Sequence, residues 1–250
     1  MPQSSTQKAP ENATARAPRF RQIVDHLRNE IVDGSLPEHT ALPSERAVAE
    51  RHSVSRMTAR RALEAVEAEG LAYSEERKGR FVSPQRLNYN ISSMANFVAD
   101  AEAEGIDLEI ELIDRKQTGA DAKLAGVLSV PIGEVLHQYT RLFRNRGHAT
   151  FLETEFVIAK RCRDFLGHDL LHPMAVLEQR YSPLGHSADI VIRMRALELD
   201  EAALLGLLPH QAGIEQEQVV RDEAGEPFCY CRQIWRGELA QFSAQAIVNR

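Results

Sequence analysis

The sequence predicts an α+β protein with a helical region at its N-terminal end and a mainly antiparallel sheet with intercalated helices behind it. Three observations support this prediction. Apolar residues recur at helical spacing up to about residue 69, alternating apolar and polar segments dominate from residue 106, and a stretch containing Pro and Asn separates these regions. We therefore expect a disordered tail over 1–17, a domain over 18–83, a linker over 84–92 and a second domain over 93–250.

The composition is that of a globular protein, with 43% hydrophobic and 26% charged residues. No apolar run approaches the roughly 20 residues that a membrane span needs, and residues 1–17 lack the apolar segment of a signal peptide. Three cysteines are too few for a secreted disulfide framework. Cys229 and Cys231 share a strand face, where we favour two half-buried side chains over a metal pair. We expect a cytoplasmic protein with no membrane partner, cofactor or metal.

Three helices are expected in the first domain. The first covers about 18–33 and ends before Gly34, and the second begins after the candidate N-cap Ser44 and continues to 52. The third covers 56–69 and stops at Gly70, which adopts the left-handed conformation easily. Because a turn of three or four residues joins the last two helices, they form a predicted helix-turn-helix.

The third helix carries its charges in an unfavourable order. Its first turn and a half is basic and polar, with Arg56, Thr58, Arg60 and Arg61, whereas its C-terminal half is acidic. The helix dipole favours the opposite order, and the inversion costs a few tenths of a kcal/mol per charge, on the order of 0.3. The inversion is explained if this N-terminal turn faces the phosphates and base edges of a DNA major groove.

Two short strands, 71–74 and 80–83, follow the third helix and enclose a basic tip. This hairpin forms a wing in which Arg77, Lys78 and Arg80 lie beside the DNA backbone or in the minor groove. Such contacts position a protein on DNA without specifying the sequence. A merely solvated face is the alternative for each cation singly, but it does not explain the ordered set.

The net charge of −6 argues against a nucleic-acid partner only if the chain is taken as a whole. Residues 18–86 hold 12 basic and 11 acidic side chains, whereas residues 87–250 hold 16 and 24. The acidic excess therefore belongs to the second domain. Whether the first domain binds a nucleic acid depends on where its arginines lie, not on the net charge of the chain.

The first domain resembles the DNA-binding domain of the GntR family of bacterial repressors. The segments that carry the resemblance are 42–46 (LPSER), 54–63 (VSRMTARRAL), 69–71 (EGL) and 78–82 (KGRFV). Carried over by position, the family's DNA contacts fall on Arg46, Ser55, Arg56, Thr58, Arg60 and Gly79. Arg77 and Arg80 stand where the family usually has Gly and Thr, which adds charge to the wing tip.

The second domain alternates strands and helices. Strands are expected at 106–115, 135–144, 150–158, 188–197, 213–221, 227–236 and 241–248, and helices at 121–128, 174–181 and 200–207, the last capped by Asp200. An Asn-Arg-Gly-His turn at 145–148 indicates a hairpin between the second and third strands.

This order resembles the UTRA effector-binding domain of the HutC subfamily, which has the chorismate-lyase fold. The resemblance rests on 139–144 (YTRLFR), 152–156 (LETEF), 203–206 (ALLG) and 225–228 (GEPF). In the family an Arg-x-Arg pair and a Glu on the next strand hold the effector. Arg141 and Glu153 match, but the second arginine falls on Phe143, with Arg144 one position later and therefore on the opposite face. A late acid of the family falls on Cys229.

Arg141 is suited to bind a phosphate, phosphonate or carboxylate, and Glu153 to accept from an amine or hydroxyl of the same ligand. The alternative is a cross-strand ion pair, worth about 0–1 kcal/mol if exposed. Arg193 and Arg195 share a strand face as a second anion clamp or, more simply, as a solvated face. The candidate effector site comprises Arg141, Arg144, Glu153, Arg193, Arg195 and Tyr230. Segments 139–144 and 192–196 resemble phosphonate-operon regulators, which favours a phosphonate-type or sugar-phosphate effector.

We expect a metabolite-responsive regulator, not an enzyme, because no dinucleotide fingerprint, P-loop or nucleophile elbow is present. Its expected partners are a pseudo-palindromic double-stranded operator, a small anionic metabolite and a second copy of the chain. Two alternatives stay open: a lyase-like enzyme fused to a DNA-binding domain, and a ligand-independent DNA binder.

Overall fold

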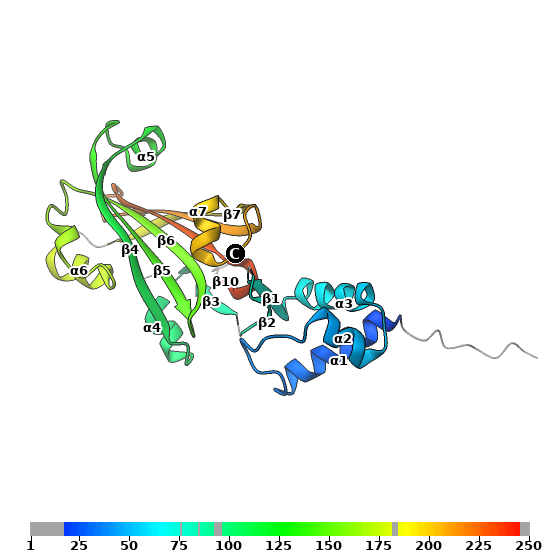
Figure 1. Ribbon diagram of the computed structural model, residues 1–250. Helices are drawn as coiled ribbons and strands as arrows, with labels where there is room; N and C mark the ends of the chain where they lie inside the picture. Colours follow the sequence, from blue (N-terminus) through cyan, green and yellow to red (C-terminus); the bar gives the residue numbers. More distant parts are fainter. Residues whose placement is uncertain (1–17, 76, 85, 93–96, 182–184, 246–250) are drawn as a thin grey trace, which may run out of the picture.

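A computed structural model describes residues 18–75, 77–84, 86–92, 97–181 and 185–245. The predicted tail over 1–17 lies outside the described residues. Figure 1 shows three helices grouped at one end of the molecule and a large twisted sheet at the other. Within the described ranges, no helix has the length and apolar character required to cross a bilayer.

The N-terminal unit has the predicted three helices and hairpin. They are α1 (Arg19–Val32), α2 (Glu45–His52), α3 (Arg56–Ala68), β1 (Ala72–Glu75) and β2 (Gly79–Val82). Ser44 and Ser55 cap α2 and α3 by accepting backbone N–H bonds from Ala47 and Thr58. Gly70 follows α3 with φ +73°, as predicted. One apolar cluster holds the unit together, formed by buried residues that include Ile23, Leu27, Ala59, Ala62, Leu63 and Val66.

The C-terminal unit is built on a six-stranded antiparallel sheet of order β4-β5-β6-β9-β8-β7. Its strands are β4 (Leu108–Gly119), β5 (Val135–Asn145), β6 (His148–Ile158), β7 (Ser187–Ala196), β8 (Ala212–Arg221) and β9 (Pro227–Trp235). Its helices are α4 (Phe97–Ala103), α5 (Ala122–Leu128), α6 (Pro173–Arg180) and α7 (Leu199–Leu205), with 3-10 turns at Phe165–Gly167 and Gly237–Leu239. The predicted α+β class is confirmed.

The structure corrects several details of the second half. The expected linker contains a strand, β3 (Leu87–Asn90), which pairs in parallel with β10 (Ala240–Ser243) because Leu87 and Tyr89 bury their side chains. Helix α4 was not predicted. Asp200 lies in the first turn of α7, since Glu198 is its N-cap, and the helix ends two residues earlier than expected. The predicted last strand over 241–248 is too long, because β10 ends at Ser243 and residues 244–245 are not part of it. Residues 246–248 of that prediction lie outside the described ranges.

Three stacked aromatic rings join the central strands. The ring of Phe151 lies 4.1 Å from that of Phe143 and 3.9 Å from that of Trp235, centroid to centroid, with nearly parallel planes. All three side chains are at most 2% exposed. Because they stand on β5, β6 and β9, the stack fixes the spacing of the strands whose other residues form the site described below.

Removal of the Phe151 ring, the middle one of the three, should therefore destabilise the fold. We expect Phe151→Ala to destabilise the chain by about 3–5 kcal/mol, the usual cost of emptying a buried aromatic position. Differential scanning fluorimetry should show a Tm fall of roughly 6 °C or more. Phe156→Ala, on the same strand but only half-buried, is the matched control, and equal shifts for both variants would contradict this role of the stack.

Candidate functional site

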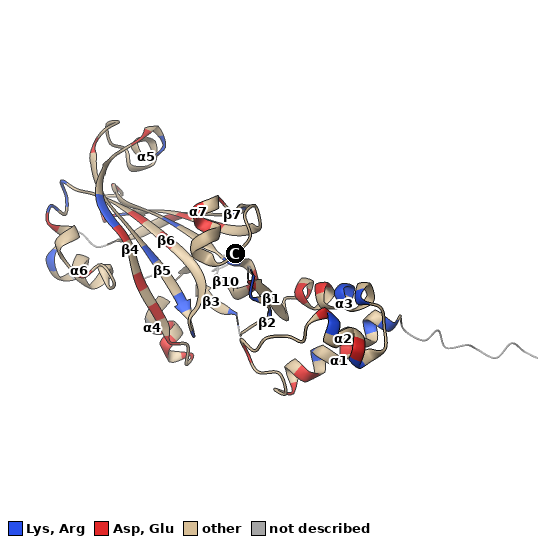
Figure 2. Ribbon diagram, in the orientation of Figure 1, with Lys and Arg blue, Asp and Glu red and all other residues tan. Residues whose placement is uncertain are grey.

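The N-terminal half of α3 is an exposed basic surface. Ser55 Oγ accepts from Thr58 N at 3.1 Å and lies 2.9 Å from Thr58 Oγ1, which fixes the first turn of the helix. Figure 2 shows that basic residues occupy the part of α3 far from the sheet and acidic residues the part near it. A groove of about 660 Å³ runs along this surface, lined by Arg19, Phe20, Met57, Thr58, Arg60, Arg61 and Glu64.

The arginines of α3 are held in different ways. Arg60 Nε donates to Glu64 at 2.8 Å, one turn along the helix, and the guanidinium of Arg61 lies 4.2 Å from the ring centroid of Phe20. Arg56 is exposed. Arg46 on α2 is paired with Glu50 at 3.3 Å, and 68% of its side chain is exposed. Exposed ion pairs of this kind are worth about 0–1 kcal/mol, so a phosphate can displace the acids.

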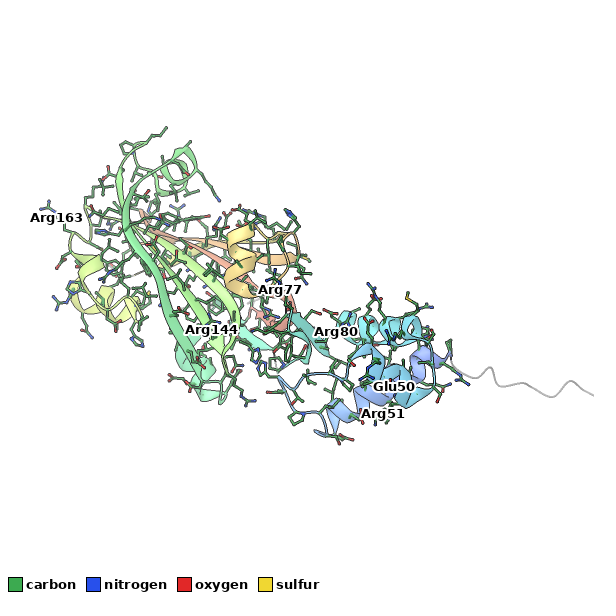
Figure 3. The ribbon with its side chains drawn as sticks, viewed as in Figure 1. Glu50, Arg51, Arg77, Arg80, Arg144 and Arg163 are labelled. Carbon is green, nitrogen blue, oxygen red and sulfur yellow. The ribbon has the colours of Figure 1, made fainter. Side chains whose placement is uncertain are left out.

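The hairpin cations are placed differently from the α3 arginines. Lys78 Nζ lies 2.9 Å from Glu75, and Arg80 lies between Glu45 at 3.5 Å and Glu67 at 3.1 Å with its side chain only 23% exposed. Arg77 and Gly79 both have positive φ, +61° and +109°, at the tip. In Figure 3, Arg77 lies on the side of the hairpin toward the C-terminal unit. The structure therefore assembles the α3 residues into one surface and holds Arg80 against acids of α2 and α3.

The second candidate site is a cavity of about 760 Å³ in the C-terminal unit. Its floor is one face of β5, β6, β8 and β9, and its walls come from β3, α4, β7 and the start of α6. The polar groups on the floor are Arg141, Glu153, Glu155, Gln218, Cys229 and Gln233. Aromatic rings of Tyr89, Phe97, Phe143 and Phe228 make much of the remaining wall.

Arg141 is the centre of the cavity floor and is only 7% exposed. Its guanidinium donates to Glu153, to Glu155 at 3.2 Å and to the Leu171 carbonyl at 2.8 Å. Arg141 and Glu153 are direct cross-strand partners and form the ion pair that the sequence left as the alternative, but the pair is buried instead of exposed. Among the described residues, its Nε atom is buried without a hydrogen-bond partner.

The pKa values of Glu153 and Glu155 are shifted in opposite directions. Burial and the neighbouring charge of Glu153 raise the pKa of Glu155 from 4.5 to about 7. Burial opposes ionisation of Glu153 as well, but the charge of Arg141 and a hydrogen bond from Gln233 hold its pKa below the usual value. The cavity therefore contains one ionised pair, Arg141 with Glu153, and a second carboxyl that changes its charge near neutrality.

A metal ion is a poor fit for this group. Donor atoms of Glu153, Glu155 and Cys231 lie within 4.8 Å of one another, which is the geometry of a candidate metal cluster. However, Arg141 already binds both carboxylates, and burial raises the pKa of the Cys231 thiol well above its usual value. Since a metal needs deprotonated ligands, the group suits the Arg141 guanidinium better than a metal ion.

Four of the predicted effector residues lie away from the cavity. Arg144 lies on the sheet face opposite to that of Arg141, where it pairs with Glu111 at 3.3 Å. Arg193 and Arg195 do share a face, but it is the opposite one, where they pair with acids of β8 and α7. Tyr230 donates to Glu217. None of the four is among the lining residues.

Sequence reasoning did not identify Glu155 or Gln233 as members of the site, and it placed Cys229 there only through the resemblance, at the position of a late acid of the family. Glu155 was available from the sequence, because it stands two positions after Glu153 and alternation puts both on one strand face. Gln233 and Cys229 belong to β9, and lie 80 and 76 residues further along the chain than Glu153; the fold brings β9 alongside β6. A local pattern cannot indicate that pairing.

The two units meet at a buried polar junction. His148, at the turn of the β5–β6 hairpin, places Nδ1 2.7 Å from Glu75 and 3.0 Å from the Tyr73 hydroxyl. The His39 ring stacks on His148 at 4.2 Å. Burial opposes ionisation of Glu75, but bonds from His148 and Lys78 lower its pKa, so the carboxylate is charged. We call Tyr73, Glu75, His148 and Arg236 the junction group.

Arg236 connects this junction with the cavity. Its side chain is fully buried, its guanidinium lies 4.8 Å from the Tyr73 ring centroid, and it approaches Glu75 at 3.9 Å. Its neighbour Trp235 donates Nε1–H to Gln233 Oε1 at 3.0 Å, and Gln233 donates to Glu153 at 2.7 Å. A continuous set of contacts thus runs from the cavity floor to strand β1.

Family models match most of the chain. Residues 20–82 match the bacterial regulatory proteins of the gntR family, and residues 103–241 match the UTRA domain. The chain is 25% identical over 232 residues to the HTH-type transcriptional repressor NagR of Bacillus subtilis, covering 92% of this chain and 96% of that protein. It is 27% identical over 235 residues to a histidine utilization repressor of Pseudomonas putida, covering 92% and 88%.

Solved structures agree on the fold. PhnF from Mycobacterium smegmatis superposes with a TM-score of 0.63 at 24% identity, covering 91% of this chain and all of that one. The C-terminal domain of the histidine utilization repressor from Pseudomonas syringae superposes at 0.52 and 19% identity, covering 56% of this chain and 99% of that one. The chain therefore belongs to the GntR family of transcription regulators and is of the HutC type, with a UTRA domain behind its helix-turn-helix.

Proposed function

We propose that this regulator is a homodimeric repressor that binds a pseudo-palindromic operator and is released by a small effector in the cavity of its C-terminal unit. The observation that carries the proposal is the buried group of Arg141, Glu153 and Glu155 on the cavity floor. Burial of such a group carries a large desolvation penalty. Apolar side chains fill a purely structural role without that penalty.

The DNA-binding part rests on α3. Its basic N-terminal half is exposed and pre-shaped by the Ser55 cap, which suits insertion into a major groove. One such helix contacts a single half-site, and its affinity falls steeply with salt. Two copies related by a two-fold axis remove that weakness and match a palindromic operator. On this proposal Arg46, Ser55, Arg56, Thr58, Arg60 and Arg61 face DNA, and Arg77, Lys78, Gly79 and Arg80 adjust the wing.

The effector is expected to carry two kinds of polar group. Arg141 favours an acidic group, consistent with the phosphonate-type or sugar-phosphate ligand expected from the sequence. Its charge is already shared by two carboxyl groups, so an anion alone gains little. A ligand that also presents an amine or hydroxyl to Glu155 compensates the second carboxylate. We therefore propose a small metabolite with an acidic group and a hydrogen-bond donor, preferably an amine.

Release of DNA is proposed to pass through Gln233, Trp235 and the junction group. A ligand that competes for Arg141 and Glu153 disturbs the Gln233 bond and, with it, the position of the β9 end that carries Arg236. Arg236 in turn supports β1 through Tyr73 and Glu75. A coupling free energy of about 1–3 kcal/mol between the sites is sufficient for regulation.

The first prediction concerns DNA. We expect Arg56→Ala and Arg60→Ala each to weaken binding to a duplex that the native protein selects from a random library, by about 1–3 kcal/mol per lost base contact. A lost phosphate contact should instead lower the salt slope by about 0.9. Arg51→Ala is the control, because Arg51 pairs with Glu30 of α1 at 2.7 Å. Equal losses in all three variants, measured by fluorescence anisotropy, would falsify the assignment of α3.

The second prediction concerns Glu155. Because its folded pKa is raised to about 7 from 4.5, the native state holds its proton more tightly than the unfolded chain, so its contribution to stability falls as pH rises from 4.5 through 7. Glu155→Gln should therefore raise Tm at pH 8.5 by at least about 3 °C and have little effect at pH 5. Thermal melts across this range test it, with Glu111→Gln on exposed β4 as control. A pH-independent difference would rule out the titration of Glu155.

The third prediction concerns coupling. Glu75→Gln keeps the shape of the side chain but removes the charge that Arg236, His148 and Lys78 surround. We expect this variant to bind DNA, and to lose at least two-thirds of the change in operator affinity that an effector causes in the native protein. Anisotropy titrations with an effector found by thermal-shift screening measure the change. An undiminished effector response in the variant would exclude the junction group from signalling.

A further inference from the structure

Two large apolar side chains of the N-terminal unit, within its described residues, stay mostly exposed. They are Val32, at 76%, and Met57, at 71%. Val32 is the last residue of α1. Met57 is the second residue of α3 and directly follows Arg56 in the first turn. It therefore lies in the basic half of the helix, on the surface that the proposed function assigns to DNA.

Met57 lies at the centre of the exposed face of α3. Arg60, Arg61 and Glu64 stand three, four and seven positions after it, which is the spacing of one helix face, and all of them are exposed. The same four residues line the groove of about 660 Å³ that runs along this surface. A helix that enters a major groove with this face presents Met57 to the edges of the base pairs.

The side chain of Met57 differs in chemistry from its neighbours on this face. Arg60 Nε donates to Glu64 at 2.8 Å, and the Arg61 guanidinium lies over the ring of Phe20. The thioether of Met57 is only a weak acceptor, and it carries no charge that a phosphate could bind. Contact between Met57 and DNA is therefore favourable only where it removes apolar surface of both partners from water.

We propose that Met57 recognises the C5-methyl group of a thymine in each half-site of the operator. This inference rests on DNA binding by α3 in the proposed function, and it adds the base that one residue of the helix selects. In the major groove, the thymine methyl is the apolar group among the donors and acceptors of the base pairs. At another base Met57 would cover polar groups that lose water without gaining a hydrogen bond, so it selects against those bases.

The local structure suits this role. The backbone beneath Met57 is fixed, because Ser55 Oγ accepts from Thr58 N at 3.1 Å and caps the helix. The methionine side chain itself has three rotatable bonds and a polarizable sulfur, so it adapts to the shape of the group it contacts. A rigid first turn with an adaptable apolar tip positions the contact without requiring one exact side-chain geometry.

Replacement of thymine by deoxyuridine removes the methyl group alone and tests the contact directly. The duplex is one that the native full-length chain selects from a random library, and each thymine is replaced at the equivalent positions of both half-sites. We expect at least one such replacement to lower the affinity by about fourfold per half-site, the loss that corresponds to one buried methyl-sized group. Fluorescence anisotropy titrations measure the loss.

Substitutions at position 57 assign the effect to this residue. Met57→Ala, and Met57→Gln with a polar side chain of similar length, should bind the thymine and deoxyuridine duplexes equally well at that position. Met57→Leu should keep the preference for thymine, because it keeps an apolar side chain. Val32→Ala is the matched control, since Val32 is equally exposed but does not line the groove. It should keep the native affinity and the native response to deoxyuridine.

Folding and DNA binding are controlled in the same experiment. Because both side chains are exposed, all four variants should have the native circular dichroism spectrum. A selected half-site without thymine, a native affinity that no deoxyuridine replacement changes, or a native response to deoxyuridine in Met57→Ala and Met57→Gln would overturn the role of Met57 and leave DNA binding by α3 intact. A native chain that selects no duplex would instead overturn the proposed function.

Discussion

The buried charge group of Arg141, Glu153 and Glu155 is the constraint on which the C-terminal unit depends. A guanidinium and two carboxyl groups removed from water cost several kcal/mol per ion unless geometry compensates them, on the order of 5. Compensation requires β5, β6 and β9 in one register, with Gln233 donating to Glu153 and the Leu171 carbonyl capping Arg141. The aromatic stack of Phe143, Phe151 and Trp235 holds that register from the same strands. Site and core are thus built by the same three elements.

Residues of β9 and the position after it also link the site to the N-terminal unit. Trp235 closes the aromatic stack, donates to Gln233 and precedes the buried Arg236. A change in the cavity therefore acts on a residue that also supports Tyr73 and Glu75 of β1. Hairpin β1–β2 continues directly from α3, so a shift of β1 alters how the recognition helix and its wing are presented to DNA. This is a physical route for coupling, and it needs no large rearrangement of either core.

Much of the N-terminal unit was predictable because its determinants are local. The Ser44 cap, the stop at Gly70 and the apolar stripe of α3 act within a few residues, and all three were identified from the sequence. The Ser55 cap is equally local but was not predicted. The cavity was only half predictable. Arg141 and Glu153 follow from facing strands joined by a short hairpin, whereas Gln233 and Cys229 reach the site through a long-range pairing. Arg144 follows alternation, because it stands three positions after Arg141 and therefore on the opposite face of β5. The strand β3 lies in the predicted linker, and it could not be recognised locally because its partner β10 lies 153 residues further along the chain.

Hydrogen exchange with and without operator DNA tests the coupling of the two units most directly, because binding free energies are reciprocal between coupled sites. Operator binding should change exchange in α3 and also in residues 227–235, which lie between the cavity and the junction group. Changes confined to residues 19–82 would contradict the account, since the DNA-binding surface would then be energetically independent of the cavity.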